Sequence, residues 1–384
     1  MKRKVVLCNE FTCTQCFACQ QACPMQCISR IESNAGFYIP DIDYNKCIGC
    51  GKCISVCHKL NDVVSNKPKV AYACWTKDVD ERRKSSSGGA FSALADSILN
   101  IGGVVYGATM RNDLHVCHVA IDDAKDLQKL QGSKYVQSEL GNSYKDIKQL
   151  LIDKRPVLFT GTPCQVASLR TYLNKDYDTL YTCDLVCHGV PSQKSFNSYL
   201  SLIGINNKVD QICFRFLQGW GFRMTARHKG QSGFKIIPPI KSFYMRAFNK
   251  GLMFSESCYA CPYASENRAG DITIGDYWGI GSQTPFAHDT SRGVSLALAN
   301  TLKGEFLLES CSKLFKEKRP LAEAIMGNDN LRRPSIRPKG RDTFYDDLRV
   351  MSMRRLCSKY GLHPTPRDYM RILKQMLYLV IVKK

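Results

Sequence analysis

Two cysteine runs near the N-terminus constrain this chain more than any other feature. Each has the spacing C-x2-C-x2-C-x3-C, and together they span residues 13–57. This spacing holds two 4Fe-4S clusters, and the fourth cysteine of each run ligates the other cluster. We therefore expect one cluster on Cys13, Cys16, Cys19 and Cys57, and a second on Cys47, Cys50, Cys53 and Cys23.

Zinc sites and disulfides are the alternatives for these cysteines. Zinc sites use C-x2-C pairs separated by a longer loop, not three-cysteine runs that occur twice. Disulfides need an oxidising compartment, and the N-terminal apolar run VVL is far too short for a signal peptide. Pro24 follows the first run as the ferredoxin pattern asks, whereas His58 stands where a second Pro is expected. The runs therefore predict a ferredoxin-like module over residues 1–62.

Size and charge bound the remaining possibilities. The 384 residues allow two or three domains, and 20 cysteines without a secretory signal predict a cytoplasmic protein. The net charge is +20, which favours an acidic partner. We do not expect nucleic-acid binding, because no helix-turn-helix, RRM or finger pattern occurs.

The C-terminal tail carries much of this charge. Residues 331–384 contain 14 Lys and Arg against 4 Asp and Glu, and the apolar residues near the end have helical spacing: Met370, Leu373, Leu377 and Ile381. Two interpretations stay open. The tail forms either a peripheral helix on an anionic membrane or a helix docked on its own domain.

From residue 70 the pattern alternates between strands and helices, which predicts an α/β domain. Strands are expected at residues 70–75, 104–110, 115–121, 156–160, 179–186, 271–279 and 294–300. Helices are expected from about residue 90 and at 142–153, 165–173, 242–252 and 303–310. Residues 61–69 read as a linker and 81–87 as a polar loop. Two hairpins are predicted, one at residues 36–47 with Phe37, Tyr38 and Ile39 over the clusters, and one at 211–228 turning at Gly219–Gly221.

Four further cysteines resemble ligand sites. Cys164 and Cys187 each follow a predicted strand and have Gly or Pro nearby, and Cys258 and Cys261 form a C-x2-C followed by Pro. Strand ends bring residues that are distant in sequence to one edge of a sheet, so these four could hold one cluster. A zinc site or plain buried thiols remain open alternatives.

Five motifs resemble the coenzyme F420 hydrogenase/dehydrogenase beta subunit family. They are SSGGAFSAL, QGSKYVQS, GTPCQVASL, DLVCHGVPS and CPYASENRAGDITIGDYWG, and they occur in the family's order up to about residue 335. The resemblance implies a bound FAD beside a 4Fe-4S cluster ligated by Cys164, Cys187, Cys258 and Cys261. The expected fold is a ferredoxin-like two-cluster module (1–62), a mixed α/β region with a FAD-binding part (70–190) and a part with cluster ligands and substrate face (191–335), and a basic helical tail (336–384).

The flavin site is expected in two loops. The first, Ser86, Ser87, Gly88 and Gly89, precedes a helix whose positive end can cradle a pyrophosphate. In the second, Gly132, Ser133, Lys134 and Tyr135, the Lys can offset phosphate or flavin charge and the Tyr can stack. Simple turns would explain both loops as well, and the GxGxxG fingerprint of a dinucleotide site is absent.

The remaining candidates are one histidine and eight cysteines. His188 could bond the third cluster or pass a proton to the flavin, or be structural. Cys8 and Cys27 lie closest to the clusters in sequence and could be substitute ligands. All eight unassigned cysteines are expected to be core or surface thiols: Cys8, Cys27, Cys74, Cys117, Cys183, Cys213, Cys311 and Cys357.

Together these parts predict an iron–sulfur flavoprotein oxidoreductase. Clusters pass single electrons and flavin exchanges one electron or a hydride, so electrons would pass between a ferredoxin or another redox protein and a small organic substrate or coenzyme F420. An alternative is a non-catalytic electron-transfer subunit of a larger redox complex.

Overall fold

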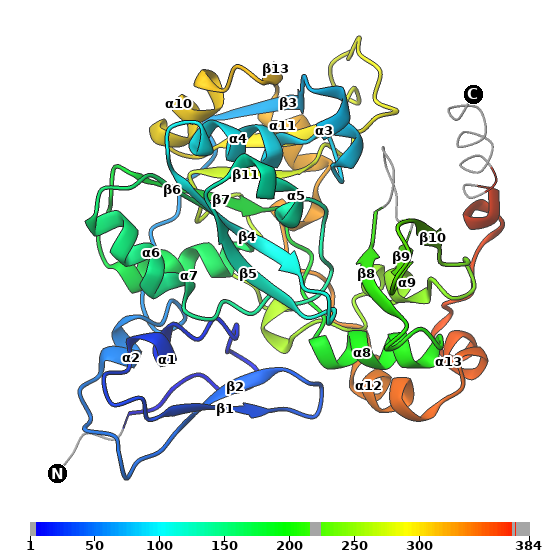
Figure 1. The fold of residues 1–384 in the computed structure, drawn as a ribbon, viewed down its shortest axis with the longest axis horizontal. Coiled ribbons are helices and arrows are strands. Elements are labelled where there is room, and N and C mark those ends of the chain that lie inside the picture. Colours follow the sequence, from blue (N-terminus) through cyan, green and yellow to red (C-terminus); the bar gives the residue numbers. More distant parts are fainter. Residues whose placement is uncertain (1–4, 216–223, 371–372, 374–384) are drawn as a thin grey trace.

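The computed structural model describes residues 5–215, 224–370 and 373. The N-terminal module (residues 5–62) lies below the main body in Figure 1. Its elements are α1 (Ala18–Ala22), β1 (Ile28–Glu32), β2 (Tyr38–Ile42) and α2 (Lys52–Ser55). The two strands form an antiparallel hairpin, and α1 contacts two helices of the main body, α6 and α7.

The predicted cover of the cysteines was wrong in detail. Phe37 is buried against Tyr345 of the C-terminal region, with ring centroids 6.4 Å apart, and Tyr38 is exposed. The reason is that the hairpin extends away from the cysteine loops toward the C-terminal helices (Figure 1). The residues that pack with the cysteines of the module are instead Val5, Ile28 and Ile42.

The main body is organised around an eight-stranded sheet of order β13-β3-β12-β11-β7-β6-β4-β5. Its strands are β3 (Val70–Thr76), β4 (Val104–Met110), β5 (Val116–Ile121), β6 (Val157–Gly161), β7 (Leu180–Leu185), β11 (Ile272–Asp276), β12 (Ser295–Ala299) and β13 (Leu314–Arg319). The central pairs β4/β6, β6/β7 and β7/β11 are parallel. β12 is antiparallel to both β11 and β3. β3 therefore points in the same direction as β11, β7, β6 and β4. The carboxyl ends of β3, β11, β7, β6 and β4 therefore share one edge.

Helices cover both faces of this sheet, which gives three layers (Figure 1). One face packs on α4, α5 and α10, and the other on α6, α7 and α11. The helices of this body are α3 (Val79–Lys84), α4 (Ala90–Leu99), η1 (Ala124–Asp126), α5 (Leu127–Leu130), α6 (Ser143–Ile152), α7 (Pro163–Leu173), α10 (Leu302–Ser310), α11 (Leu321–Met326) and η3 (Asp329–Leu331). The mixed α/β prediction is confirmed, but α3 occupies part of the predicted loop at 81–87.

A second, smaller unit packs beside the sheet. It contains α8 (Gln193–Leu202), β8 (Val209–Cys213), β9 (Thr225–His228), β10 (Phe234–Ile236), α9 (Phe243–Asn249), η2 (Glu256–Cys258), α12 (Arg341–Val350) and α13 (Met353–Tyr360). The three strands form an antiparallel sheet. The predicted turn at Gly219–Gly221 lies outside the described residues.

The beginning of the tail belongs to this smaller unit. Phe344, Leu348 and Leu356 are buried in its core, and α12 contacts α8. Farther along, Met370 and Leu373 are exposed, and the predicted helical stripe continues into Leu377 and Ile381, outside the described residues. Across the described ranges, no helix combines the length and apolarity that crossing a bilayer needs.

Candidate functional site

The third cysteine set (Cys164, Cys187, Cys258 and Cys261) comes together at the carboxyl edge of the sheet. Cys164 is the second residue of α7, which follows β6, and Cys187 follows β7, the parallel neighbour of β6. Cys258 ends η2, and Cys261 lies three residues farther on. Parallel neighbours place their carboxyl ends side by side, so the topology brings the first two together and the loop after α9 supplies the others.

The electrostatics of the set show how close these thiols lie. Burial raises the pKa of Cys164 well above its usual value, and charge on the other three thiols adds to that shift. Burial and Cys261 raise the pKa of Cys187 to about 12. Burial and Cys187 likewise raise the pKa of Cys258. Four mutually interacting thiols from three segments are a donor set suited to a 4Fe-4S cluster, whose bound iron would favour the thiolate forms.

A buried ion pair holds the segment of Cys261 against the sheet. The Arg268 guanidinium is fully buried and its Nη2 lies 2.7 Å from Asp184 Oδ1, at the end of β7. Nη1 donates to the carbonyl oxygen of Tyr263 at 2.7 Å, and Nη2 donates to that of Leu185 at 2.8 Å. Arg268 was not among the residues predicted from the sequence, because charged residues are seldom buried and periodicity gives no sign of them.

The predicted ligands of the N-terminal module are expected in two groups of four, which adjoin at Cys19 and Cys53. Burial is the largest cause that raises the pKa of Cys13 and of Cys19. For Cys57 the largest cause is a hydrogen bond with Cys8. Charge on Cys16 adds to the upward shift in all three. Burial raises the pKa of Cys53, and nearby Cys23 and Cys50 add to the shift. We call Cys13, Cys16, Cys19 and Cys57 the inner set, and Cys23, Cys47, Cys50 and Cys53 the outer set.

The outer set is more exposed than the inner set, although Cys53 of the outer set is also buried. Cys50 is exposed, whereas Cys13, Cys16 and Cys19 are buried. Cys16 packs in the same core as Cys164 and Cys261. The inner set therefore lies between the outer set and the third set.

Two further thiols accompany these groups. Cys8 Sγ lies 3.8 Å from Cys57 Sγ, and Cys23 Sγ lies 3.5 Å from Cys27 Sγ. The structure thus places Cys8 and Cys27 beside predicted ligands, and a role as substitute ligands stays a prediction. Within the part of the chain that is described, no group of three or more His, Cys, Asp or Glu is arranged to hold a single metal ion.

The two predicted flavin loops meet in space. The Ser133 backbone N–H donates to Ser86 Oγ at 2.8 Å. Gly89 is the N-cap of the ten-residue α4 and has no side chain to cap it. A Cβ at Gly132, where φ is +79°, would meet no atom within 4 Å. Uncapped N–H groups at a helix start and open space beside a glycine suit the phosphates of a dinucleotide.

Gly88 and Ser87 have structural partners. A Cβ on Gly88 would lie 2.5 Å from the carbonyl oxygen of Cys74 on β3 and 2.7 Å from the Ser295 backbone N on β12. Ser87 Oγ donates to the carbonyl oxygen of Val294. The close packing of this loop on the sheet thus requires glycine at position 88 whatever the loop binds.

The side chains of Lys134 and Tyr135 have partners of their own within the protein. Lys134 Nζ donates to the carbonyl oxygens of Leu130 at 3.0 Å and Gln131 at 2.7 Å, at the end of α5. Burial lowers the pKa of Lys134 to about 7. The Tyr135 ring packs edge-on to Phe248, with centroids 4.8 Å apart. A phosphate contact by Lys134 remains a prediction.

A polar group lies beside His188. Arg215 Nη1 forms an ion pair with Asp276 Oδ2 at 2.7 Å, and both side chains are largely buried. Desolvation lowers the pKa of His188, whereas the carboxylates of Asp276 and Asp329 act in the opposite direction. Arg215 was not among the predicted residues, because nothing local in the strand pattern distinguishes it from a surface arginine.

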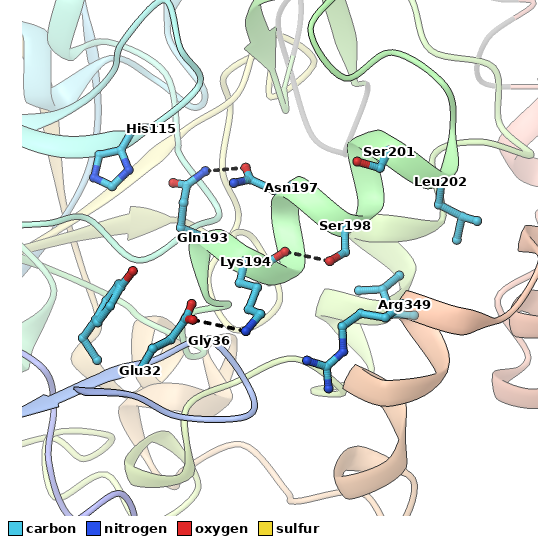
Figure 2. A pocket seen from close by; sticks show the side chains of 12 residues that line it. Glu32, Gly36, His115, Gln193, Lys194, Asn197, Ser198, Ser201, Leu202 and Arg349 are labelled. Carbon is cyan, nitrogen blue, oxygen red and sulfur yellow. Dashed lines mark hydrogen bonds and ion pairs between the residues drawn. The ribbon is translucent and has the colours of Figure 1, made fainter. Parts of the chain in front are cut away.

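One cavity of about 630 Å³ lies elsewhere, between the hairpin of the N-terminal module and α8. Figure 2 shows its polar lining, in which Lys194 Nζ forms an ion pair with Glu32 Oε2 at 3.2 Å and Gln193 Nε2 donates to Asn197 Oδ1 at 3.0 Å. No predicted ligand or flavin residue lines it. The cavity is therefore separate from the candidate site.

The family models agree with this arrangement. The 4Fe-4S dicluster domain matches residues 12–60. The N-terminal domain of the coenzyme F420 hydrogenase/dehydrogenase beta subunit matches residues 71–144, and the C terminus of the same subunit matches residues 154–319. The chain therefore belongs to the coenzyme F420 hydrogenase/dehydrogenase beta subunit family, as its motifs predicted. It is an iron–sulfur protein of an oxidoreductase family.

The other comparisons add little. Among solved structures, 13 chains match. One belongs to the xenon-derivatised F420-reducing [NiFe] hydrogenase complex from Methanosarcina barkeri, with 17% identity and a TM-score of 0.46, over 77% of this chain and 92% of that one. A similarity of this degree supports no statement about function. The comparison with curated proteins gave no match.

Proposed function

We propose that this protein is an FAD-dependent oxidoreductase that holds three 4Fe-4S clusters. It would pass electrons between a redox protein such as a ferredoxin and a small organic substrate or coenzyme F420. The observation that carries the proposal is the convergence of Cys164, Cys187, Cys258 and Cys261 at the sheet edge that also bears the two flavin loops.

The ligand assignment follows the three sets. The inner and outer sets each supply four thiolates to one cluster, and the third set supplies four to another. The clusters would carry one electron at a time, and the flavin would supply the two-electron chemistry. Because the outer set includes the exposed Cys50, it forms the side open to an electron-carrying protein, and the net charge of +20 suits an acidic one.

The flavin residues and the proton carrier have separate tasks. The start of α4 would hold the phosphates, and the open space beside Gly132 would receive them. His188 would move a proton at the reacting face, where Asp276 favours its charged form. Arg215, paired with Asp276, would hold that carboxylate in place.

Anaerobic purification with iron, sulfide and flavin quantified tests this function. Three clusters predict roughly twelve Fe per chain, beside one FAD, and Cys164→Ser should lose roughly four Fe while the two N-terminal clusters remain. Unchanged iron in Cys164→Ser would refute the third set. Reoxidation of the reduced protein by a partner protein, and by no small molecule, would show a relay subunit instead of an enzyme.

A matched pair of variants tests the flavin loops. Gly132→Asp places a carboxylate in open space, and Gly132→Asn has the same shape without the charge; both residues tolerate left-handed backbone better than most. We expect FAD to be lost from the Asp variant and retained by the Asn variant. Gly88 is unsuitable for this test, because any side chain there collides with Cys74 on β3. Equal flavin content in both variants would place the phosphates elsewhere.

A further inference from the structure

His58 and Tyr263 join the N-terminal module to the main body. His58 Nδ1 and the Tyr263 hydroxyl are 2.7 Å apart, and both residues are almost completely buried. The other ring nitrogen, Nε2, lies 2.7 Å from Thr14 Oγ1. One ring nitrogen donates and the other accepts, so each nitrogen of the imidazole has a partner.

The pair lies between two cysteine sets. His58 follows Cys57 of the inner set, and Tyr263 follows Cys261 of the third set by two residues. Tyr263 packs in one buried core with Cys16, Cys164 and Cys261. Burial raises the pKa of Tyr263, and charge on thiols of both sets adds to the shift. Tyr263 is therefore close to both sets at once.

The chain offers a short bonded connection at this place. His58 is the residue after Cys57, and its side chain is hydrogen-bonded to that of Tyr263. Only Pro262 separates Tyr263 from Cys261 in the chain. Arg268 donates to the carbonyl oxygen of Tyr263 and so fixes it on β7. His58 stands where the ferredoxin pattern has Pro, and a Pro ring offers no hydrogen-bonding nitrogen. The departure from the pattern thus supplies one half of the connection.

We propose that an electron passes between the inner-set cluster and the third cluster by way of the hydrogen bond that joins His58 and Tyr263. The inference rests on the proposed three-cluster function. With clusters bound, Cys57 of the inner set and Cys261 of the third set would hold the donor and the acceptor; one would lose one electron, the other would gain it, and no bond would form or break. The electron comes from a one-electron donor, either a low-potential redox protein or dithionite.

Tyr263→Phe tests this role, because it removes the hydroxyl and keeps the ring. The chain is mixed with less dithionite than its clusters can accept, and freeze-quenched EPR follows the appearance of the reduced third cluster, with Cys164→Ser as the spectral reference. We expect this rate to fall about tenfold, equivalent to ~1.4 kcal/mol of activation free energy. An unchanged rate at full iron content would overturn the proposal.

Tyr144→Phe is the matched control. Tyr144 lies in the same core near Cys16 and Cys164, but its hydroxyl donates to the carbonyl oxygen of Gln165 within the main body. The control should keep the rate of the unaltered chain. Equal slowing in both variants would show general loosening of the core and contradict the proposal.

Two readouts separate this role from a merely structural one. Spin–spin broadening in the fully reduced protein depends on the distance between clusters and should be the same in Tyr263→Phe and the unaltered chain. His58→Asn keeps groups that donate and accept hydrogen bonds and should retain more of the rate than His58→Phe, which keeps only the aromatic volume. Equal rates in the two His58 variants would count against the proposal. A failure of the three-cluster function would appear earlier, as less than twelve Fe in the unaltered chain.

Discussion

The two cysteine runs of the N-terminal module have the same backbone and different surroundings. Left-handed residues occur at matching places: Gln15 (φ 55°) and Phe17 (φ 53°) in the first run, and Gly49 (φ 71°) and Gly51 (φ 74°) in the second. Glycine adopts this conformation without strain, whereas other residues need surrounding contacts to hold it. The first run must therefore be fixed by neighbours that the second run does without.

For Gln15 those neighbours lie outside the module, one in the smaller unit and one in the main body. Gln15 Nε2 donates to Ser255 Oγ at 3.2 Å, and Gln137 Nε2 donates to Gln15 Oε1 at 3.1 Å. In the second run, by contrast, nothing lies within 4 Å of a Cβ built at Gly51. The two copies of the repeat therefore differ in their surroundings: the first is held by contacts with residues outside the module, and the second has open space at Gly51.

The largest effect is expected at Phe17, which is buried beneath the Arg30 guanidinium 4.2 Å from its ring centroid. Phe17→Ala should destabilise the module by about 3–5 kcal/mol. Phe17→Gly should be less damaging than Phe17→Ala, because glycine avoids the left-handed cost of about 1–2 kcal/mol. The anaerobic temperature at which the iron–sulfur absorbance bleaches measures both. A lower bleaching temperature for Phe17→Gly than for Phe17→Ala would contradict backbone strain at this position.

A smaller effect is expected in the second run. Gly51→Ala has room for its methyl group, so it should cost only the left-handed strain, about 1–2 kcal/mol. Gly233→Ala is the control, since its position is equally open and φ there is outside the left-handed range. That change should be neutral or stabilise by about 0.4–1 kcal/mol. Bleaching temperatures compare the two, and identical shifts would contradict the conformational argument.

The smallest effect concerns the ion pair that Arg30 of the module forms with Glu139 of the main body. The pair is partly exposed, so Glu139→Gln should cost only about 0.2–1 kcal/mol, and salt should abolish the difference. Burial alone would raise the pKa of Glu139, but Arg30 and, to a smaller extent, His115 lower it below its usual value. The contact therefore stabilises above the ordinary carboxyl pKa and is lost as the pH falls through the lowered value.

Limited proteolysis between the module and the main body, in low and high salt, measures this contact. The Gln variant should be cleaved slightly faster than the unaltered chain in low salt and equally fast in high salt. A difference that persists in high salt would mean that Glu139 contributes through packing and not through charge.

The sequence predicted the elements better than their contacts. Alternating apolar residues located most strands of the large sheet, and strands followed by Cys164 and Cys187 indicated where the third set would form. The edge strand β13 (LFKEKR) was missed because its charges hide the alternation. Helix α3 was missed although Asp78 caps it and Arg82, Arg83 and Lys84 end it, which are ordinary helix signals.

Contacts between distant segments left no local trace. Arg268 and Asp184 pair across 84 residues, and His58 and Tyr263 across 205. Each residue alone resembles a surface residue, and only the order of the strands makes it a buried partner. Spacing therefore revealed the cysteine sets, whereas the groups that hold them had to be read from the fold.

The hairpin contact with the C-terminal region has a consequence for biosynthesis. Phe37 packs on Tyr345, and Ser192 Oγ donates to the carbonyl oxygen of Ala35 at 2.6 Å. Ribosomes add about 5–20 residues per second, so Tyr345 is made roughly 15–60 s after Phe37 at those rates. The hairpin, which is translated among the first segments, therefore completes its packing only after the C-terminal region has been made.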